Sequence, residues 1–460
     1  MGAQKLERTT FKTSRASEYF DARELQAMTG QSRTRFASVA LKELVDNALD
    51  ACEKAGVEPK VGIRVLEDPT EDKIHITVSD NGPGIPPAVV DAVLDYDVRV
   101  SDKAAYRSPT RGAQGNALKT VVGIPYALGR EEPVIIEGEG IRHEIQPWID
   151  PAGVLRIEHG KSDAPVDETY KSRVSLTVPW DDQLFDADYW VRAFAMFNPH
   201  ADIDFDHLQY GGLRCETYKR DVSDGWRKYM PTDLTSAHWY TTAAMKRLVF
   251  SHIGHAESNG GRDLPIGKFI RQFRGLSGPK KAKLVRAAVE EFPHLSAFKE
   301  HPERVGELLE AMKEHSKSPG HRVFGRVGPE HFEAVFERSY EVLEFNYAWD
   351  NSYTPAGLPY IFEIALATTS EPGDLYYGIN YTAAFDDPLE GTLLAGPKFK
   401  THGIRGFLQH SHALPQSEGY YSFRSPVNVA VAVHIITPAP VFLDRGKTRI
   451  QLSEEEDNRG

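Results

Sequence analysis

This chain of 460 residues has few cysteines, no long apolar run and no net positive charge. Only two cysteines are present, Cys52 and Cys215, so neither a disulfide framework nor a four-cysteine metal site can be built. No stretch of about 18 consecutive apolar residues occurs, and the start MGAQKLERTTFKTSR lacks the apolar core of a secretory signal. These absences favour a protein of the reducing cytoplasm that is not associated with a membrane.

The formal net charge is −12, with 66 acidic residues against 54 Lys and Arg. A protein that coats nucleic acid by bulk electrostatics needs an excess of positive charge, so any contact with DNA must come from a local basic patch. A solvated helical face is the alternative interpretation of such a patch. The best candidate patch consists of Arg271, Arg274, Lys280, Lys281 and Lys283.

Length predicts a multidomain protein, and the pattern of apolar residues predicts helices and strands in separate segments, as in an α+β fold. The hydrophobic and charged contents, 40% and 26%, are typical of a globular protein, and the length suits two or three domains. Residues 1–211 mix helical and strand patterns, residues 212–322 are rich in Lys, Arg and short helical patterns, and residues 323–452 return to strands and helices. Residues 453–460 form an acidic tail.

Within this frame, hydrophobic periodicity predicts individual elements. Apolar residues at helical spacing predict a helix over residues 36–55, and the alternating segment 73–80 predicts a strand that ends in the turn cluster NGPGIPP. Four apolar runs between residues 133 and 180 predict a meander of strands, and residues 360–436 contain further β-rich runs.

The predicted helix carries the first candidate motif, Glu43 and Asn47. Being four residues apart, they differ by only about 40° around the helix axis and project from one face. A carboxylate there can orient and deprotonate the water that attacks a γ-phosphate, and the Asn47 amide oxygen can ligate a Mg²⁺ ion that bridges the phosphates. A solvated helix face is the alternative, and Asp46 and Asp50 fit that interpretation better.

The second motif, Asp80 to Ile85, lies where the predicted strand ends in a turn. An ionised carboxylate only accepts hydrogen bonds and the exocyclic amine of adenine only donates them, so Asp80 is expected to bind the base. Gly82 and Gly84 lack the Cβ atoms that would keep the backbone away from a flat ring, and Ile85 completes the motif. An ordinary Asn-Gly turn is the alternative.

The third motif, RGAQGNALK, begins at Arg111 and runs into a predicted helix. Glycines before a helix N-terminus expose backbone N–H groups to an anion, and the helix dipole adds positive charge at the same point. The preceding polar segment 99–110, with Ser101 as a nucleotide contact, is expected to form a mobile lid; packing alone is the alternative for the glycines. The predicted phosphate contacts are Arg111, Gly112, Ala113, Gln114, Gly115, Asn116, Ala117 and Leu118.

In order, spacing and placement, the three motifs resemble the Bergerat nucleotide-binding fold of the GHKL ATPases, which include gyrase, heat-shock chaperones, MutL and histidine kinases. The resemblance implies ATP and Mg²⁺ as ligands. Ala117 stands where most of the family has a last glycine, as in MutL. The family's fourth element is a hydroxyl beside the base-binding carboxylate, and Thr177 matches it; a plain strand threonine is the alternative.

Further segments resemble the B subunit of topoisomerase VI along nearly the whole chain. The resemblance implies a GHKL sandwich, a helix-two-turn-helix insert and a transducer domain of the ribosomal-S5-like α/β type. Lys447 then falls on the transducer loop where the family presents a lysine to the γ-phosphate, although a surface lysine is the alternative. The resembling segments are 13–20 (TSRASEYF), 197–201 (FNPHA), 238–250, 270–283, 359–367 and 379–385.

The resemblance implies an ATP-dependent homodimer that clamps DNA and drives strand passage. Neither a winged-helix domain with a tyrosine nucleophile nor a Toprim metal site is recognisable, so a separate A-type subunit is expected to cleave the DNA. A non-cleaving clamp, similar to MutL or to defence ATPases, is the alternative that the net charge and the MutL-like third motif favour. A sensor kinase fits poorly, because sensor kinases place this domain after a phosphoacceptor helix.

A metal site at His200, Asp202, Asp204 and Asp206 is one more candidate. Alternation in DIDFD places the three carboxylates on one face of a strand. A solvent-facing edge strand is the simpler interpretation of the same pattern.

Overall fold

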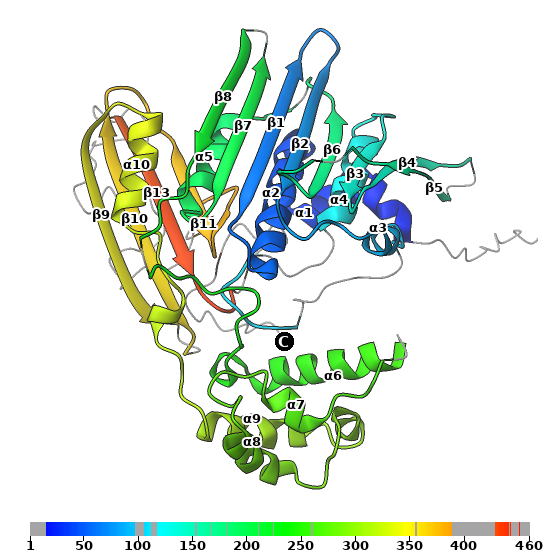
Figure 1. Cartoon of the computed structure of the whole chain (residues 1–460), viewed down its shortest axis with the longest axis vertical. Coiled ribbons are helices and arrows are strands. Elements are labelled where there is room, and N and C mark those ends of the chain that lie inside the picture. Colours follow the sequence, from blue (N-terminus) through cyan, green and yellow to red (C-terminus); the bar gives the residue numbers. More distant parts are fainter. Residues whose placement is uncertain are drawn as a thin grey trace, which may run out of the picture.

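The structure is a computed structural model with two β-sheets and a separate group of helices, arranged as Figure 1 shows. This confirms the α+β class. No helix among the described residues is long and apolar enough to cross a membrane. The residues that the structure describes are 15–96, 105–111, 117–151, 154–165, 167–181, 183–209, 211–223, 225–258, 261–354, 357–388, 428–440, 442 and 450.

The first sheet has eight strands in the order β5-β4-β3-β6-β2-β1-β7-β8. Neighbouring strands are antiparallel, except that β1 and β7 run parallel. The expected meander between residues 133 and 180 is confirmed as β3 to β6. The strands are β1 (Lys60–Asp68), β2 (Lys73–Asp80), β3 (Val134–Gly138), β4 (Ile141–Ile149), β5 (Leu155–Asp163), β6 (Ser172–Val178), β7 (Asp202–Gln209) and β8 (Gly212–Tyr218).

Helix α2 (Phe36–Ala55) is the central helix on this sheet and confirms the expected helix over residues 36–55. It packs against β1 and β2 and ends at Gly56, whose left-handed φ of 70° favours glycine. Helix α4 (Ala117–Ala127) packs beside it, and at Gly123 the backbone of Tyr19 approaches so closely that no Cβ would fit. The remaining elements of this layer are η1 (Arg15–Phe20), α1 (Ala22–Thr29), η2 (Arg33–Arg35), α3 (Pro87–Val93) and α5 (Ala187–Phe197).

The second sheet has five strands in the order β12-β11-β13-β10-β9, and only β11 and β13 are parallel. Helix α10 (Pro329–Ser339) packs on β9 and β10, whereas α5 contacts β7 of the first sheet as well as β11 and β12. The two sheets are therefore joined through α5. The strands are β9 (Val342–Tyr353), β10 (Pro359–Thr369), β11 (Leu375–Ile379), β12 (Thr382–Ala383) and β13 (Asn428–Ile436).

Between β8 and α10 lies a group of short helices, here called the helical insert, which Figure 1 shows apart from both sheets. Its fully buried residues include Phe269, Phe273 and Leu308. The expected boundary between residues 211 and 212 falls in the turn between β7 and β8, and because β8 pairs with β7 the insert begins after β8. Its elements are η3 (Ala237–Trp239), α6 (Thr242–Ser258), α7 (Ile266–Ile270), α8 (Pro279–Arg286), η4 (Ala287–Val289), η5 (Leu295–Lys299), α9 (Arg304–Glu314) and η6 (His321–Val323).

Candidate functional site

One face of α2 remains open although most of the helix is buried. Asn47 is exposed, and the Glu43 side chain keeps 33% of its accessible surface. Lys42 lies 3.8 Å from the Glu43 carboxylate and 2.9 Å from that of Asp46. The two residues of the first motif therefore present a carboxylate and an amide from the same accessible face, as their spacing predicts.

Asp80 is the last residue of β2, and its carboxylate is buried. Oδ1 accepts a hydrogen bond from the backbone N–H of Gly82 at 2.8 Å and one from the Ser172 hydroxyl at 3.4 Å. Burial raises the pKa of Asp80 to about 6, and these two hydrogen bonds oppose that shift. At neutral pH most of the carboxylate is thus ionised, which is the form that accepts hydrogen bonds from an adenine amine.

The turn after Asp80 packs directly against the open face of α2. A Cβ atom on Gly82 would lie 3.2 Å from the Cβ of Ala51, which follows Asn47 by one helical turn. Gly84 has a φ of 93°, in the region that favours glycine, and the backbone of Ile85 lies against Gly138 on β3. The structure therefore brings the first and second motifs together, with Asp80 beside the face that carries Glu43 and Asn47.

Part of the third motif lies within the described residues. Ala117 and Leu118 are half-buried in the first turn of α4, which packs on α2. Lys119, in the same turn, is buried and donates a hydrogen bond to the backbone carbonyl of Asp95. The expected contacts that lie outside the described residues are Ser101, Gly112, Ala113, Gln114, Gly115, Asn116 and Lys447.

The expected position of Thr177 beside Asp80 is wrong. In the antiparallel pairing of β2 and β6, Asp80 lies opposite Ser172, whereas Thr177 lies opposite His75 near the other end of both strands. The Thr177 hydroxyl is 3.0 Å from His75 Nδ1. Ser172 is therefore the hydroxyl beside the buried carboxylate, and sequence patterning missed it because the strand register is set by pairing.

The Arg111 side chain, expected at the phosphates, lies in a buried cluster of hydrogen bonds and ion pairs. It is only 2% exposed and donates to Glu53 Oε1 at 2.6 Å, to the backbone carbonyl of Tyr381 at 3.1 Å and to Asn198 Oδ1. Its guanidinium also lies 3.5 Å from Asp50 Oδ1. Arg111 thus fixes the start of the third motif to the last turns of α2 and to the second sheet.

Glu53 is the centre of this buried cluster. Its Oε1 atom also lies 2.5 Å from Lys228 Nζ and 2.8 Å from His200 Nε2. Although burial favours the neutral acid, the charges of Arg111 and Lys228 hold the pKa of Glu53 well below its usual range. Burial and the charge of Lys228 lower the pKa of His200 to about 4, and burial and the charge of Arg111 lower the pKa of Lys228 to about 7. Arg111 is therefore the permanent counter-ion of Glu53.

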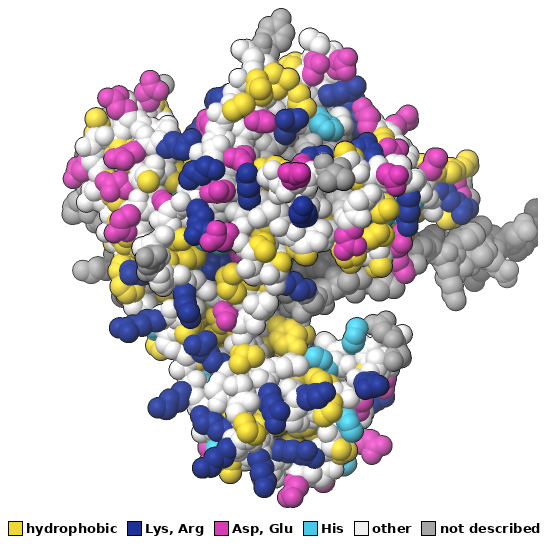
Figure 2. All heavy atoms as spheres, in the orientation of Figure 1, with side chains coloured by type: hydrophobic (Ala, Val, Ile, Leu, Met, Phe, Trp, Pro, Cys, Tyr) yellow, Lys and Arg dark blue, Asp and Glu magenta, His cyan; other side chains and the backbone are white. Residues whose placement is uncertain are grey.

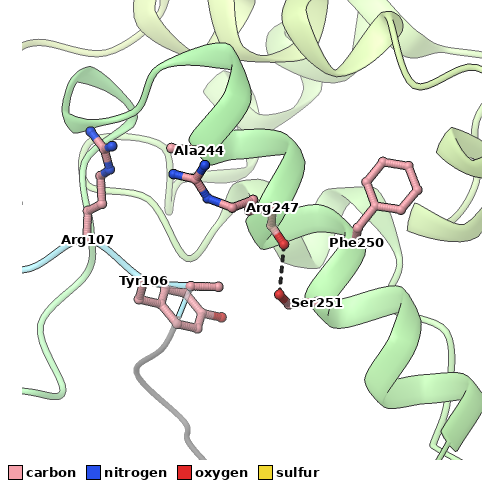
Figure 3. A pocket seen from close by; sticks show the side chains of 7 residues that line it. Tyr106, Arg107, Ala244, Arg247, Phe250 and Ser251 are labelled. Carbon is pink, nitrogen blue, oxygen red and sulfur yellow. Dashed lines mark hydrogen bonds between the residues drawn. The ribbon is translucent and has the colours of Figure 1, made fainter. Parts of the chain in front are cut away.

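Tyr106 and Arg107, which belong to the segment 99–110 expected to form a mobile lid, contact the helical insert. The Tyr106 hydroxyl donates to Gln272 Oε1 at 2.8 Å and lies 2.9 Å from His252 Nε2 on α6. Tyr106, Arg107 and Arg247 of α6 line a pocket of about 560 Å³, whose lining side chains are drawn in Figure 3. Residues 97–104 lie outside the described residues.

The metal site considered at residues 200–206 is not assembled. His200 points to Glu53, and Asp204 and Asp206 pair with Lys60 and Arg64. The simpler interpretation, a solvent-facing edge strand, is also wrong, because β7 pairs with β8 on its outer side. In the part of the chain that the structure describes, no three His, Cys, Asp or Glu side chains form a group that could hold a metal ion.

Residues 33–124 match the sequence profile of the histidine kinase-, DNA gyrase B- and HSP90-like ATPases. The match includes α2, whose open face is described above, and the Asp80 turn and the start of α4, which pack against α2. The chain therefore contains a GHKL ATPase domain, as the three motifs predicted.

The chain is also similar to the B subunits of type 2 DNA topoisomerase 6 from several organisms. The protein from Thermococcus sibiricus is 29% identical over 42% of this chain and 35% of its own length, and the protein from Pyrococcus furiosus is 27% identical over the same shares. The protein from Natronomonas pharaonis is 28% identical over 41% of this chain and 24% of its own length. The similarity is thus confirmed as a distant homology over less than half of the chain, which spans about a third of the length of the first of these relatives.

A solved structure, the ATPase region of Saccharomyces cerevisiae topoisomerase II bound to ICRF-187 (dexrazoxane), aligns with 90% of this chain and 77% of its own length. The sequence identity is 11% and the TM-score is 0.38.

Proposed function

We propose that this chain, which carries a GHKL ATPase domain, binds and hydrolyses ATP with Mg²⁺ at the open face of α2. One observation carries the proposal: the Asp80 turn packs through Gly82 onto the helix face that presents Glu43 and Asn47. A base-binding carboxylate and the groups needed at the phosphates therefore lie on one surface. The profile match over residues 33–124 supports the same conclusion.

In this proposal Asp80 accepts a hydrogen bond from the adenine amine, and Ser172 supports the carboxylate. Gly82, Gly84 and Ile85 form the wall of the base site. Residues 112–116 and the first turn of α4, with Ala117 and Leu118, supply backbone N–H groups to the phosphates. Ser101 belongs to the polar segment that covers them.

The proposed chemistry needs one carboxylate, one metal ligand and one cation. Glu43 orients and deprotonates the attacking water, and Asn47 would help to hold Mg²⁺ through its amide oxygen. A bound Mg²⁺ ion would neutralise charge that develops on the phosphates. Lys447 is proposed to contact the γ-phosphate, so that hydrolysis removes an attraction between two domains.

We further propose that the chain acts as the ATP-gated half of a type IIB DNA topoisomerase. The support is the distant homology to the B subunits of topoisomerase 6. The second sheet then serves as the transducer, two copies close on each other when ATP binds, and a separate A-type subunit cleaves DNA. The alternative is a non-cleaving ATP-dependent clamp, which the net charge of −12 favours.

Purified chain incubated with ATP, Mg²⁺, linked DNA circles and a candidate A-type subunit tests this proposal. Decatenation that requires ATP and both chains supports the topoisomerase. ATP-dependent dimerisation without strand passage supports the clamp. Failure to bind ATP, measured by calorimetry at millimolar nucleotide, would contradict both.

The basic patch of the helical insert is the proposed DNA contact. Lys280, Lys281 and Lys283 lie on α8 and are exposed, and Figure 2 shows Lys and Arg side chains gathered over the insert. Changing these three lysines to alanine is expected to weaken binding of duplex DNA and to lower the slope of log K against log salt by about three, since each phosphate contact contributes about 0.9.

The salt dependence is measured by fluorescence anisotropy between about 50 and 200 mM salt, a range over which DNA affinities that depend on phosphate contacts fall strongly. A variant with Lys161, Lys171 and Lys219 changed to alanine is the matched control, because these exposed lysines lie on or beside the first sheet. Equal slopes for the two variants would exclude a specific role for α8.

A further inference from the structure

The pocket between residues 105–107 and helix α6 is lined by none of the residues that are proposed to bind ATP. Figure 3 shows the side chains that line it, which come from both segments. On α6 they form one face of the helix, because Ala244, Arg247 and Ser251 recur at spacings of three and four residues. The small side chain of Ala244 leaves room beside Arg247. The pocket is therefore a separate feature of the molecule that the proposed function does not use.

Arg107, from the other segment that lines the pocket, is fixed by its own backbone. Its N–H donates to the Tyr240 hydroxyl at 2.8 Å, and its carbonyl accepts a hydrogen bond from the Thr235 hydroxyl at 2.7 Å. The guanidinium donates one hydrogen bond, to the backbone carbonyl of Trp239. A guanidinium has five N–H donors, and the others of Arg107 make no hydrogen bond within the part of the chain that the structure describes. The cation is thus held in place with donors that a ligand can use.

Arg107 and Arg247 bring two positive charges to one pocket without a negative partner. None of the residues that line the pocket is acidic. Among the described residues, neither guanidinium forms an ion pair with a carboxylate. Burial and the charge of Arg247 lower the pKa of Arg107, because each of them disfavours its charged form. A bound anion would offset both charges.

A phosphate group fits these two arginines better than a carboxylate does. The guanidinium is planar and presents parallel N–H donors, which match two oxygens of one phosphate. A phosphate monoester carries a charge of about −1.5 to −2 at pH 7, so it balances two cations, whereas a carboxylate balances only one. The charge of the pocket therefore selects a phosphate monoester.

Two aromatic side chains also line the pocket. The Tyr106 ring is held by its hydroxyl, which donates to Gln272 and lies 2.9 Å from His252 Nε2. Phe250 follows Arg247 by three residues on α6 and is 37% exposed. Aromatic rings beside cations are typical of sites where nucleobases stack. The volume of the pocket also lies in the range of about 300–1,000 Å³ that is usual for small ligands. A ligand with a phosphate and a planar ring would therefore use both parts of the lining.

We infer that this pocket is a second nucleotide site, which binds the phosphate of a nucleoside monophosphate between Arg107 and Arg247 and its base against Phe250 and Tyr106. The same chemistry is offered by two sources, a free nucleotide and an unpaired nucleotide of a nucleic-acid strand. The inference does not depend on the proposed ATP site, because the two sites share no residue.

The test measures binding of thymidine monophosphate to the full chain by calorimetry. Thymine has no exocyclic amine that could donate to Asp80, so this probe is unsuited to the proposed ATP site. Saturable binding is expected. Asp80→Asn should weaken binding of a non-hydrolysable ATP analogue but not of thymidine monophosphate, so the two sites can be told apart.

Arg247→Gln should weaken binding of thymidine monophosphate about 10- to 100-fold, the range that one lost hydrogen bond to a charged group spans. Arg247 is exposed, so the fold should be unaffected. Phe250→Ala should weaken binding of thymidine monophosphate about tenfold through lost stacking and leave binding of inorganic phosphate unchanged. Arg286→Gln is the matched control, because Arg286 is an exposed arginine of α8 outside the pocket, and it should bind both probes normally.

A short single strand of thymidylate separates the two sources. If the strand binds no more tightly than thymidine monophosphate, the ligand is a free nucleotide. If the strand binds more tightly and Arg247→Gln removes the gain, the ligand is an unpaired nucleotide of a strand. The inference is overturned if neither probe binds, if Arg247→Gln binds them as tightly as the unaltered chain does, or if inorganic phosphate binds as tightly as thymidine monophosphate. Weakening by Asp80→Asn but not by Arg247→Gln would place the probe in the ATP site and overturn it too.

Discussion

Glu43→Ala should lower the rate of ATP hydrolysis by about 10²- to 10⁴-fold, the contribution that a positioned general base usually makes. The side chain lies on the open face of α2 and is one-third exposed, so its removal should leave the fold intact. Binding of ATP should persist, because Asp80 and the residues proposed to bind the phosphates are untouched. The ATP-bound dimer should therefore accumulate and be visible by size-exclusion chromatography with light scattering.

Glu58→Ala provides the control, since Glu58 is an exposed carboxylate just beyond the end of α2. It should hydrolyse ATP at the rate of the unaltered chain. Hydrolysis at a normal rate by Glu43→Ala would show that another group activates the water.

Asp80→Asn should weaken ATP binding by about 10- to 100-fold. The variant replaces a charged acceptor with a neutral amide, and a hydrogen bond to a charged group is worth about 1.5–3 kcal/mol, of which each 1.4 kcal/mol is tenfold in affinity. Calorimetry with the ATP analogue measures the loss. Unchanged affinity would remove Asp80 from the base site.

The same substitution should stabilise the nucleotide-free protein at neutral pH. The folded pKa of Asp80, about 6, lies above the ordinary value of 3.8. Because the folded state binds this proton more tightly than the unfolded state does, protonation of Asp80 stabilises the fold. This stabilisation is fully present below about pH 4 and is lost as pH rises through about 6. An asparagine stays neutral, so Asp80→Asn is expected to gain about 1–3 kcal/mol at pH 7, at 1.36 kcal/mol per pKa unit.

Thermal unfolding at pH 4 and pH 7 tests this sign. The melting temperatures of the two proteins should differ little at pH 4, and the variant should melt at the higher temperature at pH 7. A variant that is less stable at pH 7 would mean that the carboxylate has a structural role that its amide cannot replace.

The sequence was sufficient where local chemistry decides the geometry. Glu43 and Asn47 share a face because helical spacing requires it, and the Asp80 turn forms because glycines allow it. The eight-stranded order, in contrast, depends on pairings such as that of β1 with β7, far apart in the chain. Periodicity within one segment carries no information about its partner strand.

The errors at the site have the same origin. Thr177 and Ser172 lie on one strand, and only the register with β2 shows which of them meets Asp80. Arg111 precedes a glycine-rich segment of the sequence, but its side chain bonds to Glu53 and Tyr381, which belong to other elements. One available signal was the number of acidic residues on α2, because Asp46, Asp50 and Glu53 need a buried cation.

The parallel pairing of β1 with β7 also has a consequence for how the chain is made. On the ribosome, β1 emerges early, but β7 (Asp202–Gln209), which pairs with its outer edge, is synthesised much later. Until then the nascent sheet has an open edge, and the chain emerges at only about 5–20 residues per second. The ATPase domain therefore acquires its complete shape only after residues well beyond its sequence motifs have left the exit tunnel.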